Sequence, residues 1–226
     1  MTKEELYTWY QEEINKGSQE LISDGTIISC NRKAYEYKII HGRNLDFTIQ
    51  CDQDWKKFVL EILSELRSKY SESEFIDIAD SLPFHDFHWR WFDKYRCLET
   101  TRFDWFYIIC DNQVQGVCIT SHPKESLFDK QNIFYIEYIA VAPWNRKCDF
   151  IVRKFQGLGT LLIKTVCNYF MNIHHYRCGF ALSAVPQAKS FYESIGMTPF
   201  PEHDHDYLFF YEMNEENTIC FLGAKK

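Results

Sequence analysis

A glycine-bearing run in the second half of the chain constrains the fold more than any other segment. Lys154-Phe155-Gln156-Gly157-Leu158-Gly159-Thr160 separates an apolar, strand-like stretch at 133–141 from an apolar, helix-like stretch at 161–171. Two glycines one residue apart let backbone N–H groups turn inward without a Cβ in the way, and the unpaired amides of the following helix point to the same place. The pattern predicts an anion-binding turn that holds a phosphate-bearing cofactor.

Length and composition indicate a soluble globular protein. The 226 residues are 46% hydrophobic and 17% aromatic, which argues against disorder. No stretch approaches about 18 uncharged apolar residues, and the N-terminus lacks the basic start and apolar run of a signal peptide. We therefore expect a cytoplasmic protein that does not associate with a membrane. The net charge of -7 disfavours nucleic acid and favours cationic partners, and a homodimer is left open.

The cysteines and histidines do not form a recognisable metal motif. The nine cysteines are an odd number without a C-x-x-C pair, so reduced thiols are expected. The runs His85-Asp86-Phe87-His88 and His203-Asp204-His205-Asp206 offer suitable donor atoms. Neither run shows an established ligand spacing with a third partner, so we predict polar loops and no metal site.

The hydrophobic pattern predicts an α/β protein, a mixed sheet with helices on both faces. We expect an N-terminal extension at 1–45 and one domain at 46–226. A Rossmann dinucleotide site is disfavoured, because the turn lacks a third glycine and no acidic residue follows at the expected distance. The expected elements are helix 4–15, strand 46–51, helix 59–70, helical stretch 75–95, hairpin strands 105–110 and 114–119, strand 133–141, helix 159–171, strand 180–184, helix 187–195 and strand 207–213.

This order of elements, with two motifs in their places, resembles the GCN5-related N-acetyltransferase (GNAT) superfamily. In the family a strand ending in Val-x-Pro leads to [Arg/Gln]-x-x-Gly-x-[Gly/Ala] and a helix, which 141–143 and 154–159 match. A later segment, Ala-x-x-Phe-Tyr-x-x-x-Gly-[Phe/Met], is met by Ala188, Phe191, Tyr192, Gly196 and Met197. The matches lie in order between residues 45 and 213. The resemblance implies an acyl-CoA N-acyltransferase fold around a mostly antiparallel sheet.

The resemblance also implies a site for acetyl-CoA as co-substrate, with no metal. The thioester carbonyl would lie near the N–H of Val141. Two departures from the family pattern concern this site: Lys154 replaces Arg or Gln and so loses the planar fork, and extra residues at 144–152 form a lid or substrate wall before the turn. The implied cofactor-binding residues are Ile139, Val141, Lys154, Gln156, Gly157, Leu158, Gly159, Thr160, Ala188 and Phe191.

Two residues are the candidates for proton transfer. By resemblance Tyr192 is the general acid that protonates the departing CoA thiolate; the alternative is that it only packs a short helix. Glu137 lies in an apolar strand, where a carboxylate is costly without a task, so it is the candidate base; the alternative is a solvated edge residue. His203 or His205 is a further candidate for contact with an amine.

We expect an enzyme that transfers acetyl from acetyl-CoA to a primary amine by direct attack in a ternary complex. The acidic balance favours a small cationic amine over a protein acceptor. The alternatives are a non-catalytic acyl-CoA-binding or sensing protein, and a nucleotide-binding protein, although the turn lacks the Gly-Lys-Ser/Thr ending of a phosphate-loop NTPase. An aromatic group either lines the acceptor pocket or packs the core: Phe84, Phe87, His88, Trp89, Trp91 and Phe92.

Overall fold

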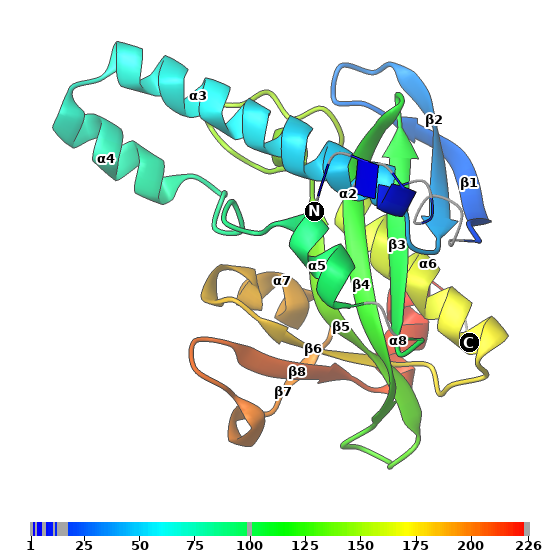
Figure 1. The fold of residues 1–226 in the computed structure, drawn as a ribbon. Helices are drawn as coiled ribbons and strands as arrows, with labels where there is room; N and C mark the ends of the chain where they lie inside the picture. Colours follow the sequence, from blue (N-terminus) through cyan, green and yellow to red (C-terminus); the bar gives the residue numbers. More distant parts are fainter. Residues whose placement is uncertain are drawn as a thin grey trace. The chain divides into compact units, whose positions relative to one another are not determined.

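The computed structural model describes residues 2, 4, 5, 8–10, 12, 18–98 and 101–223 (Figure 1). The chain divides into two compact units, the first formed by 1–99, 107–116 and 140–158 and the second by 100–106, 117–139 and 159–226. The predicted helix at 4–15 falls partly outside the described residues; those described at 4, 5, 8–10 and 12 are helical. The division into 1–45 and 46–226 stays a prediction.

The strands form a mixed sheet, which confirms the predicted fold class. Their order is β1-β2-β3-β4-β5-β6-β8-β7. The pairs β1–β2, β6–β8 and β7–β8 are antiparallel, whereas β5–β6 is parallel. The bounds are β1 Glu20–Ile28, β2 Ala34–His41, β3 Phe103–Cys110, β4 Gln113–Glu125, β5 Asn132–Val141, β6 Phe180–Ala184, β7 Thr198–Pro199 and β8 Phe209–Met213.

In the first unit a long helical stretch replaces the strand predicted at 46–51. The helix α2 (Leu45–Gln50), one π-helical turn η1 (Cys51–Trp55) and α3 (Lys56–Lys69) follow without a break. Asn44 starts the stretch, since its side chain accepts a hydrogen bond of 2.8 Å from the Phe47 amide. The strand prediction was wrong because a short alternating run is compatible with either a strand or a helix. An N-cap residue followed by an acidic first turn is the stronger signal, and it indicates a helix.

Two further helices complete the first unit, where the sequence predicted one helical stretch at 75–95. They are α4 (Glu72–Ser81) and α5 (Trp91–Cys97), and the intervening segment is not helical. Figure 1 shows α4 folding back beside α3. Val59, Leu66, Leu82 and Phe84 form the core between them. Ser71 and Glu74 make a capping box that starts α4.

The second unit is built around α6 (Leu158–Ile173), which connects the parallel strands β5 and β6. Its inner side carries Phe170, whose ring stacks on Phe134 of β5 with centroids 4.4 Å apart. The short η3 (Pro186–Ala188), α7 (Lys189–Ser194) and η4 (Pro201–His203) follow β6. The sequence pattern did not predict β7 or α8 (Glu215–Leu222). Asn214 is the N-cap residue of α8.

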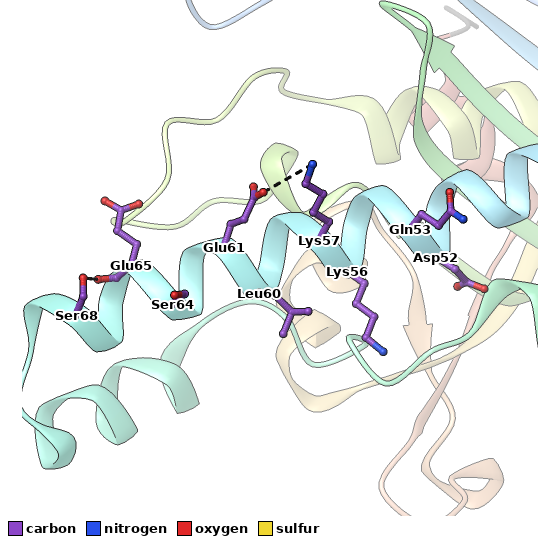
Figure 2. A pocket seen from close by; sticks show the side chains of 9 residues that line it. All are labelled: Asp52, Gln53, Lys56, Lys57, Leu60, Glu61, Ser64, Glu65 and Ser68. Carbon is purple, nitrogen blue, oxygen red and sulfur yellow. Dashed lines mark hydrogen bonds and ion pairs between the residues drawn. The ribbon is translucent and has the colours of Figure 1, made fainter.

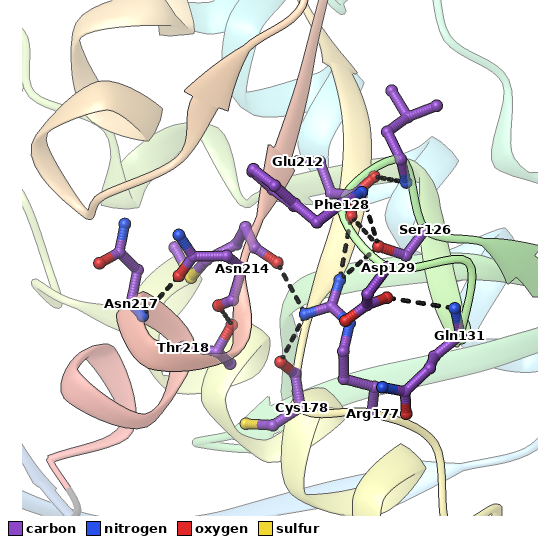
Figure 3. Close-up of polar contacts among 12 residues, drawn as sticks. Ser126, Phe128, Asp129, Gln131, Arg177, Cys178, Glu212, Asn214, Asn217 and Thr218 are labelled. Carbon is purple, nitrogen blue, oxygen red and sulfur yellow. Dashed lines mark hydrogen bonds and ion pairs between the residues drawn. The ribbon is translucent and has the colours of Figure 1, made fainter.

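A buried ion pair fastens the strands of the second unit (Figure 3). Glu212 on β8 is fully buried, and its Oε1 accepts hydrogen bonds from Arg177 Nη2 at 2.9 Å and from Ser126 Oγ at 2.6 Å. Its Oε2 accepts from the Leu127 amide at 2.8 Å. Arg177 also pairs with Asp129 at 3.0 Å. Both oxygens of the buried carboxylate therefore accept hydrogen bonds, as a buried charge requires.

Of the helices that the structure describes, none combines the length and the apolarity that a membrane crossing needs.

Candidate functional site

The strand β5 separates from β6 before either strand ends. The parallel register runs from Phe134↔Phe180 to Ile136↔Leu182, although β5 continues to Val141. Beyond Ile136 the backbone of β5 therefore has no described partner on the β6 side. Because α6 connects the two parallel strands, its N-terminus lies toward the carboxyl end of β5, which is where ligands bind in α/β units.

The glycine run forms the turn that begins α6. Gly157 has φ +81°, a value that side chains rarely adopt, and a Cβ placed there would meet no atom within 4 Å. The glycine is therefore needed for its conformation, and open space lies above it. Gln156 and Gly157 are exposed, whereas Leu158 is buried and fixes the first turn of the helix. Gly159 and Thr160 are half-buried.

A buried polar network holds the residues just before this turn. The side chain of Gln115 is fully buried, and its Oε1 accepts hydrogen bonds from Trp144 Nε1 and Asn145 Nδ2, both at 2.8 Å. Asn145 Oδ1 accepts in turn from the Phe155 amide at 3.0 Å. The Lys154 amide donates to the Trp144 carbonyl at 3.0 Å. These bonds close the two ends of the 144–152 insertion against each other.

The insertion lies against the helical hairpin of the first unit. Cys148 and Ile151 pack on the core between α3 and α4, and the Phe150 ring meets Tyr70 edge-on with centroids 6.4 Å apart. Val152 is 92% exposed, against 40% for Phe150. The role of the insertion as a lid or substrate wall stays a prediction.

The side chain of Lys154 reaches toward the β3–β4 turn. Its Nζ lies 2.8 Å from Asp111 Oδ2 and 5.8 Å from the ring centroid of Tyr35. The pairing lowers the pKa of Asp111, first through the hydrogen bond and then through the charge of Lys154. Lys154 thus connects the glycine turn to the β3–β4 hairpin. Its position in the family motif did not predict this contact.

Arg146, which the sequence reading missed, fixes the end of β5. Its Nε and Nη2 donate to the Val141 carbonyl at 3.0 and 2.8 Å. Its guanidinium forms a two-pronged pair with Asp86, with Nη2 2.8 Å from Oδ2, and Nη1 donates to the Pro83 carbonyl. Val141, the residue assigned to the thioester by resemblance, is therefore held by a charged side chain from the insertion.

An aromatic pocket of about 470 Å³ shares Arg146 as part of its wall, together with Pro143. The predicted aromatic group lines it with the exception of Phe92. The predicted helical stretch at 75–95 does not include Trp89, because α5 begins only at Trp91. The aromatic and histidine side chains of the lining are Trp55, Phe84, Phe87, His88, Trp89 and Trp91.

The carboxylates of this pocket already have partners. Both oxygens of Asp52, in η1, accept hydrogen bonds from the Trp91 and Phe92 amides at 2.8 and 2.9 Å and so cap α5. Asp86 pairs with Arg146. Two of the rings already contact cations, since Lys94 Nζ lies 4.9 Å from the centroid of Trp89 and Lys56 Nζ lies 6.0 Å from that of Phe87. Apolar and π contacts therefore dominate the binding surface.

The candidate proton-transfer residues both belong to the second unit. Tyr192, on α7, is only 7% exposed, and burial, with a smaller contribution from Cys118, raises the pKa of its phenol. Glu137 Oε1, on β5, accepts a hydrogen bond of 2.6 Å from Ser121 Oγ. In the described part of the chain, Glu137 thus bonds Ser121 and not Tyr192. Ala188 caps α7, and Phe191 is 39% exposed.

A larger hollow of about 830 Å³ lies along η1 and α3. Figure 2 shows its lining side chains, from Asp52 to Ser68, following one another along a single helical stretch. Lys57 and Glu61 pair there at 4.0 Å, as on many solvated helix faces. This surface has no opposing wall in its lining and no convergent polar groups, so it is not the candidate site.

The predicted histidine runs take structural positions. Asp204 Oδ1 accepts from the Phe210 amide at 2.8 Å, and the ring of His203 lies 5.6 Å from that of Phe210. Asp86, in the other run, pairs with Arg146. Both observations fit the prediction of polar loop structure.

Comparisons with known proteins show similar folds. No protein-family model matches the chain, and no curated protein sequence matches it. A protein of Bacillus halodurans described as uncharacterized aligns with a TM-score of 0.54 and 9% identity over 90% of this chain and 96% of its own. The PaiA N-acetyltransferase of Thermoplasma acidophilum, in complex with coenzyme A, aligns with a TM-score of 0.46 and 11% identity over 79% and 98%.

The N-acetyltransferase PseH of Campylobacter jejuni, in complex with acetyl coenzyme A, aligns with a TM-score of 0.38 and 14% identity over 65% of this chain and 93% of its own. Identities this low concern the fold alone, and the two lower TM-scores carry no argument about activity. The TM-score of 0.54 shows that this chain shares its fold with the Bacillus halodurans protein.

Proposed function

We propose that the protein is an N-acetyltransferase that moves the acetyl group of acetyl-CoA to a primary amine. One observation carries the proposal: β5 leaves β6 after Ile136, and the next α-helix of the chain, α6, begins at a Gly-x-Gly turn in which Gln156 and Gly157 are exposed. The freed backbone edge at 137–141 suits the amide groups of a pantetheine arm, which can add to it as an extra strand. The amides at 156–160 suit its pyrophosphate.

The reaction requires only proton transfers and correct placement. The ammonium group of the acceptor first loses one proton to solvent, and the neutral nitrogen then attacks the thioester carbon. The C–S bond of the resulting tetrahedral oxyanion breaks, and the nitrogen loses a second proton while the CoA sulfur gains one. In this proposal the Val141 amide contacts the oxyanion, held in place through Arg146. Tyr192 supplies the proton to sulfur, for which its raised pKa keeps the phenol protonated, and Glu137 receives the proton of the amine.

For the acceptor we propose a small cationic amine with an apolar body. The aromatic pocket supports this choice, because its wall residue Arg146 also binds the Val141 carbonyl. Its two carboxylates are engaged by α5 and by Arg146, so the pocket favours a single ammonium group near aromatic rings over a polycation. A protein acceptor is the less favoured alternative.

Thermal unfolding with ligands is the first test. Acetyl-CoA and CoA should raise the Tm, whereas ATP and NAD should leave it unchanged, because a ligand raises Tm by binding only the native state. A response to ATP instead of CoA would favour a nucleotide-binding protein. A panel of amines with thiol release as readout then identifies the acceptor, and aryl-alkyl monoamines should exceed polyamines.

The substitution Tyr192→Phe separates the enzyme from a non-catalytic acyl-CoA-binding protein. We expect acetyl transfer to fall by about 10²-fold or more while CoA binding persists, as for loss of a general acid. Tyr211→Phe is the matched control, since Tyr211 is a buried tyrosine whose hydroxyl donates to Glu193 at 2.8 Å. Equal loss in both variants, or no thiol release by the unmodified protein with any amine, would contradict the proposed catalysis.

A further inference from the structure

Three potential metal ligands meet in the second unit, although the sequence places them far apart. Asp104 belongs to β3, His122 to β4, and His174 directly follows α6. One oxygen or ring nitrogen from each residue lies within 4.8 Å of the others. His122 Nε2 is 2.7 Å from Asp104 Oδ2. No linear spacing motif connects these residues, so they could not be grouped from the sequence pattern.

Neighbouring side chains hold both imidazole rings. The ring of His174 stacks on Phe170 at 5.2 Å and lies 4.5 Å from the ring of His122. His122 Nδ1 is 3.1 Å from the hydroxyl of Tyr176. With Nδ1–H donating to that oxygen, the Nε2 lone pair is directed toward Asp104 and a shared ion. Such an outer partner on the second ring nitrogen is a regular feature of metal-binding histidines.

We propose that Asp104, His122 and His174 bind one divalent transition-metal ion, with Zn²⁺ the best match. Two imidazoles and a carboxylate are borderline ligands that suit zinc, and a water completes a tetrahedral set of four. Bonds of about 2.0–2.1 Å require the donor atoms to be roughly 3.3 Å apart, so modest side-chain rotations suffice.

The ion has a structural task, separate from the proposed acetyl transfer. The 16 residues of α6 span about 24 Å, and the cluster lies at the end of the helix opposite the glycine turn. By joining β3, β4 and the end of α6, the ion stabilises the native state, because the unfolded chain has no preformed site. Side chains of Asp104 and His122 are 16% and 11% exposed, which leaves room for entry and for one water.

Full-length protein treated with a chelator and then given Zn²⁺ or Co²⁺ provides the test. We expect one ion per chain by elemental analysis, a raised Tm with Zn²⁺ but not Mg²⁺, and the visible bands of tetrahedral Co²⁺ without the near-ultraviolet band of a cobalt–thiolate bond. The last criterion matters because Cys30, Cys97 and Cys220 are exposed thiols. No rise in Tm, or a thiolate band, would overturn the proposal.

Variants assign the ligands. His174→Gln and His122→Gln should each weaken Zn²⁺ binding by about 100-fold or more, and Tyr176→Phe by roughly tenfold. The matched control His205→Gln, at an exposed histidine in an Asp-rich loop, should bind like the unmodified protein. The His174 variant lies beyond the last turn of α6 and keeps the test usable if the β4 variant does not fold. Unchanged affinity in folded His174→Gln would overturn the assignment, while CoA binding is expected to persist throughout.

Discussion

The ion pair between Arg177 and Glu212 allows a quantitative prediction. Replacing Glu212 by Gln removes a fully buried charge that accepts from Arg177, Ser126 and the Leu127 amide. The new amide group faces donors, so at least one of them loses its acceptor, and Arg177 keeps only the partly exposed Asp129 as an anion. Breaking such a pair from one side costs about 3 kcal/mol of unfolding free energy. For a chain of this size the Tm should fall by about 6–12 °C.

Urea unfolding followed by tryptophan fluorescence measures this change, with a lower midpoint and an unchanged slope expected. The control Glu202→Gln alters an exposed carboxylate and should shift the free energy by less than about 0.5 kcal/mol. The double variant Arg177→Met with Glu212→Leu should lose less stability than Glu212→Gln, because no buried charge is left unpaired; Asp129, which loses Arg177, is partly exposed. A loss below about 1 kcal/mol for Glu212→Gln, or a double variant as unstable as the sum of the single variants, would refute the reasoning.

Three other perturbations have defined outcomes. Gly157→Ala should cost about 1 kcal/mol, since its φ of +81° disfavours a side chain, and calorimetry should show weaker CoA binding; unchanged affinity would argue against the turn as phosphate site. Asp52→Asn should lower the urea midpoint by about 1 kcal/mol through the weakened cap of α5, whereas Asp54→Asn should not. Burial, then Glu193, raises the pKa of Tyr211 to about 12. The unfolded chain therefore loses this proton first, near pH 10, so stability falls as the pH rises toward 12; Tyr211→Phe should show a shallower decline in urea midpoint over that window, and an equal decline would contradict this assignment.

The sequence pattern predicted those elements in which the buried positions are clearly more apolar than the exposed ones over a short stretch. The strands at 133–141 and 180–184 and the helices α3 and α6 were found because they are apolar and periodic. The stretch beginning at Leu45 was misread, although Leu45, Thr48, Cys51, Trp55 and Val59 are all buried at helical spacing. The strand prediction considered only the six residues 46–51, which alternate. The helical period of the buried positions becomes visible only over a longer window of several helical turns.

The N-terminal hairpin was missed for the opposite reason. All nine residues of β1 and seven of the eight residues of β2 are exposed or half-exposed, so their side chains carry little of the apolar contrast on which a strand prediction depends. The strands are specified mainly by backbone pairing and by the turn between them. Such elements cannot be recognised from hydrophobic pattern alone.

For the candidate site, the motif located the turn and α7 but not the residues that support them. Gln115 bonds Asn145 across 30 positions, and Arg146 bonds Asp86 across 60. Glutamine and asparagine are common surface residues, and nothing local distinguishes a buried one. Their positions follow from tertiary pairing, which a single sequence does not display. Arg177 with Glu212, 35 positions apart, is a similar case.

The paired hydrogen bonds at the base of the 144–152 insertion isolate its tip from the glycine turn. Trp144 bonds Lys154 and Asn145 bonds Phe155, so the chain enters and leaves the loop at fixed points whatever its length. Around Val152 the chain is therefore a natural place to graft a peptide tag or a fluorescent reporter. A label there would follow events near the turn without altering the backbone that forms it.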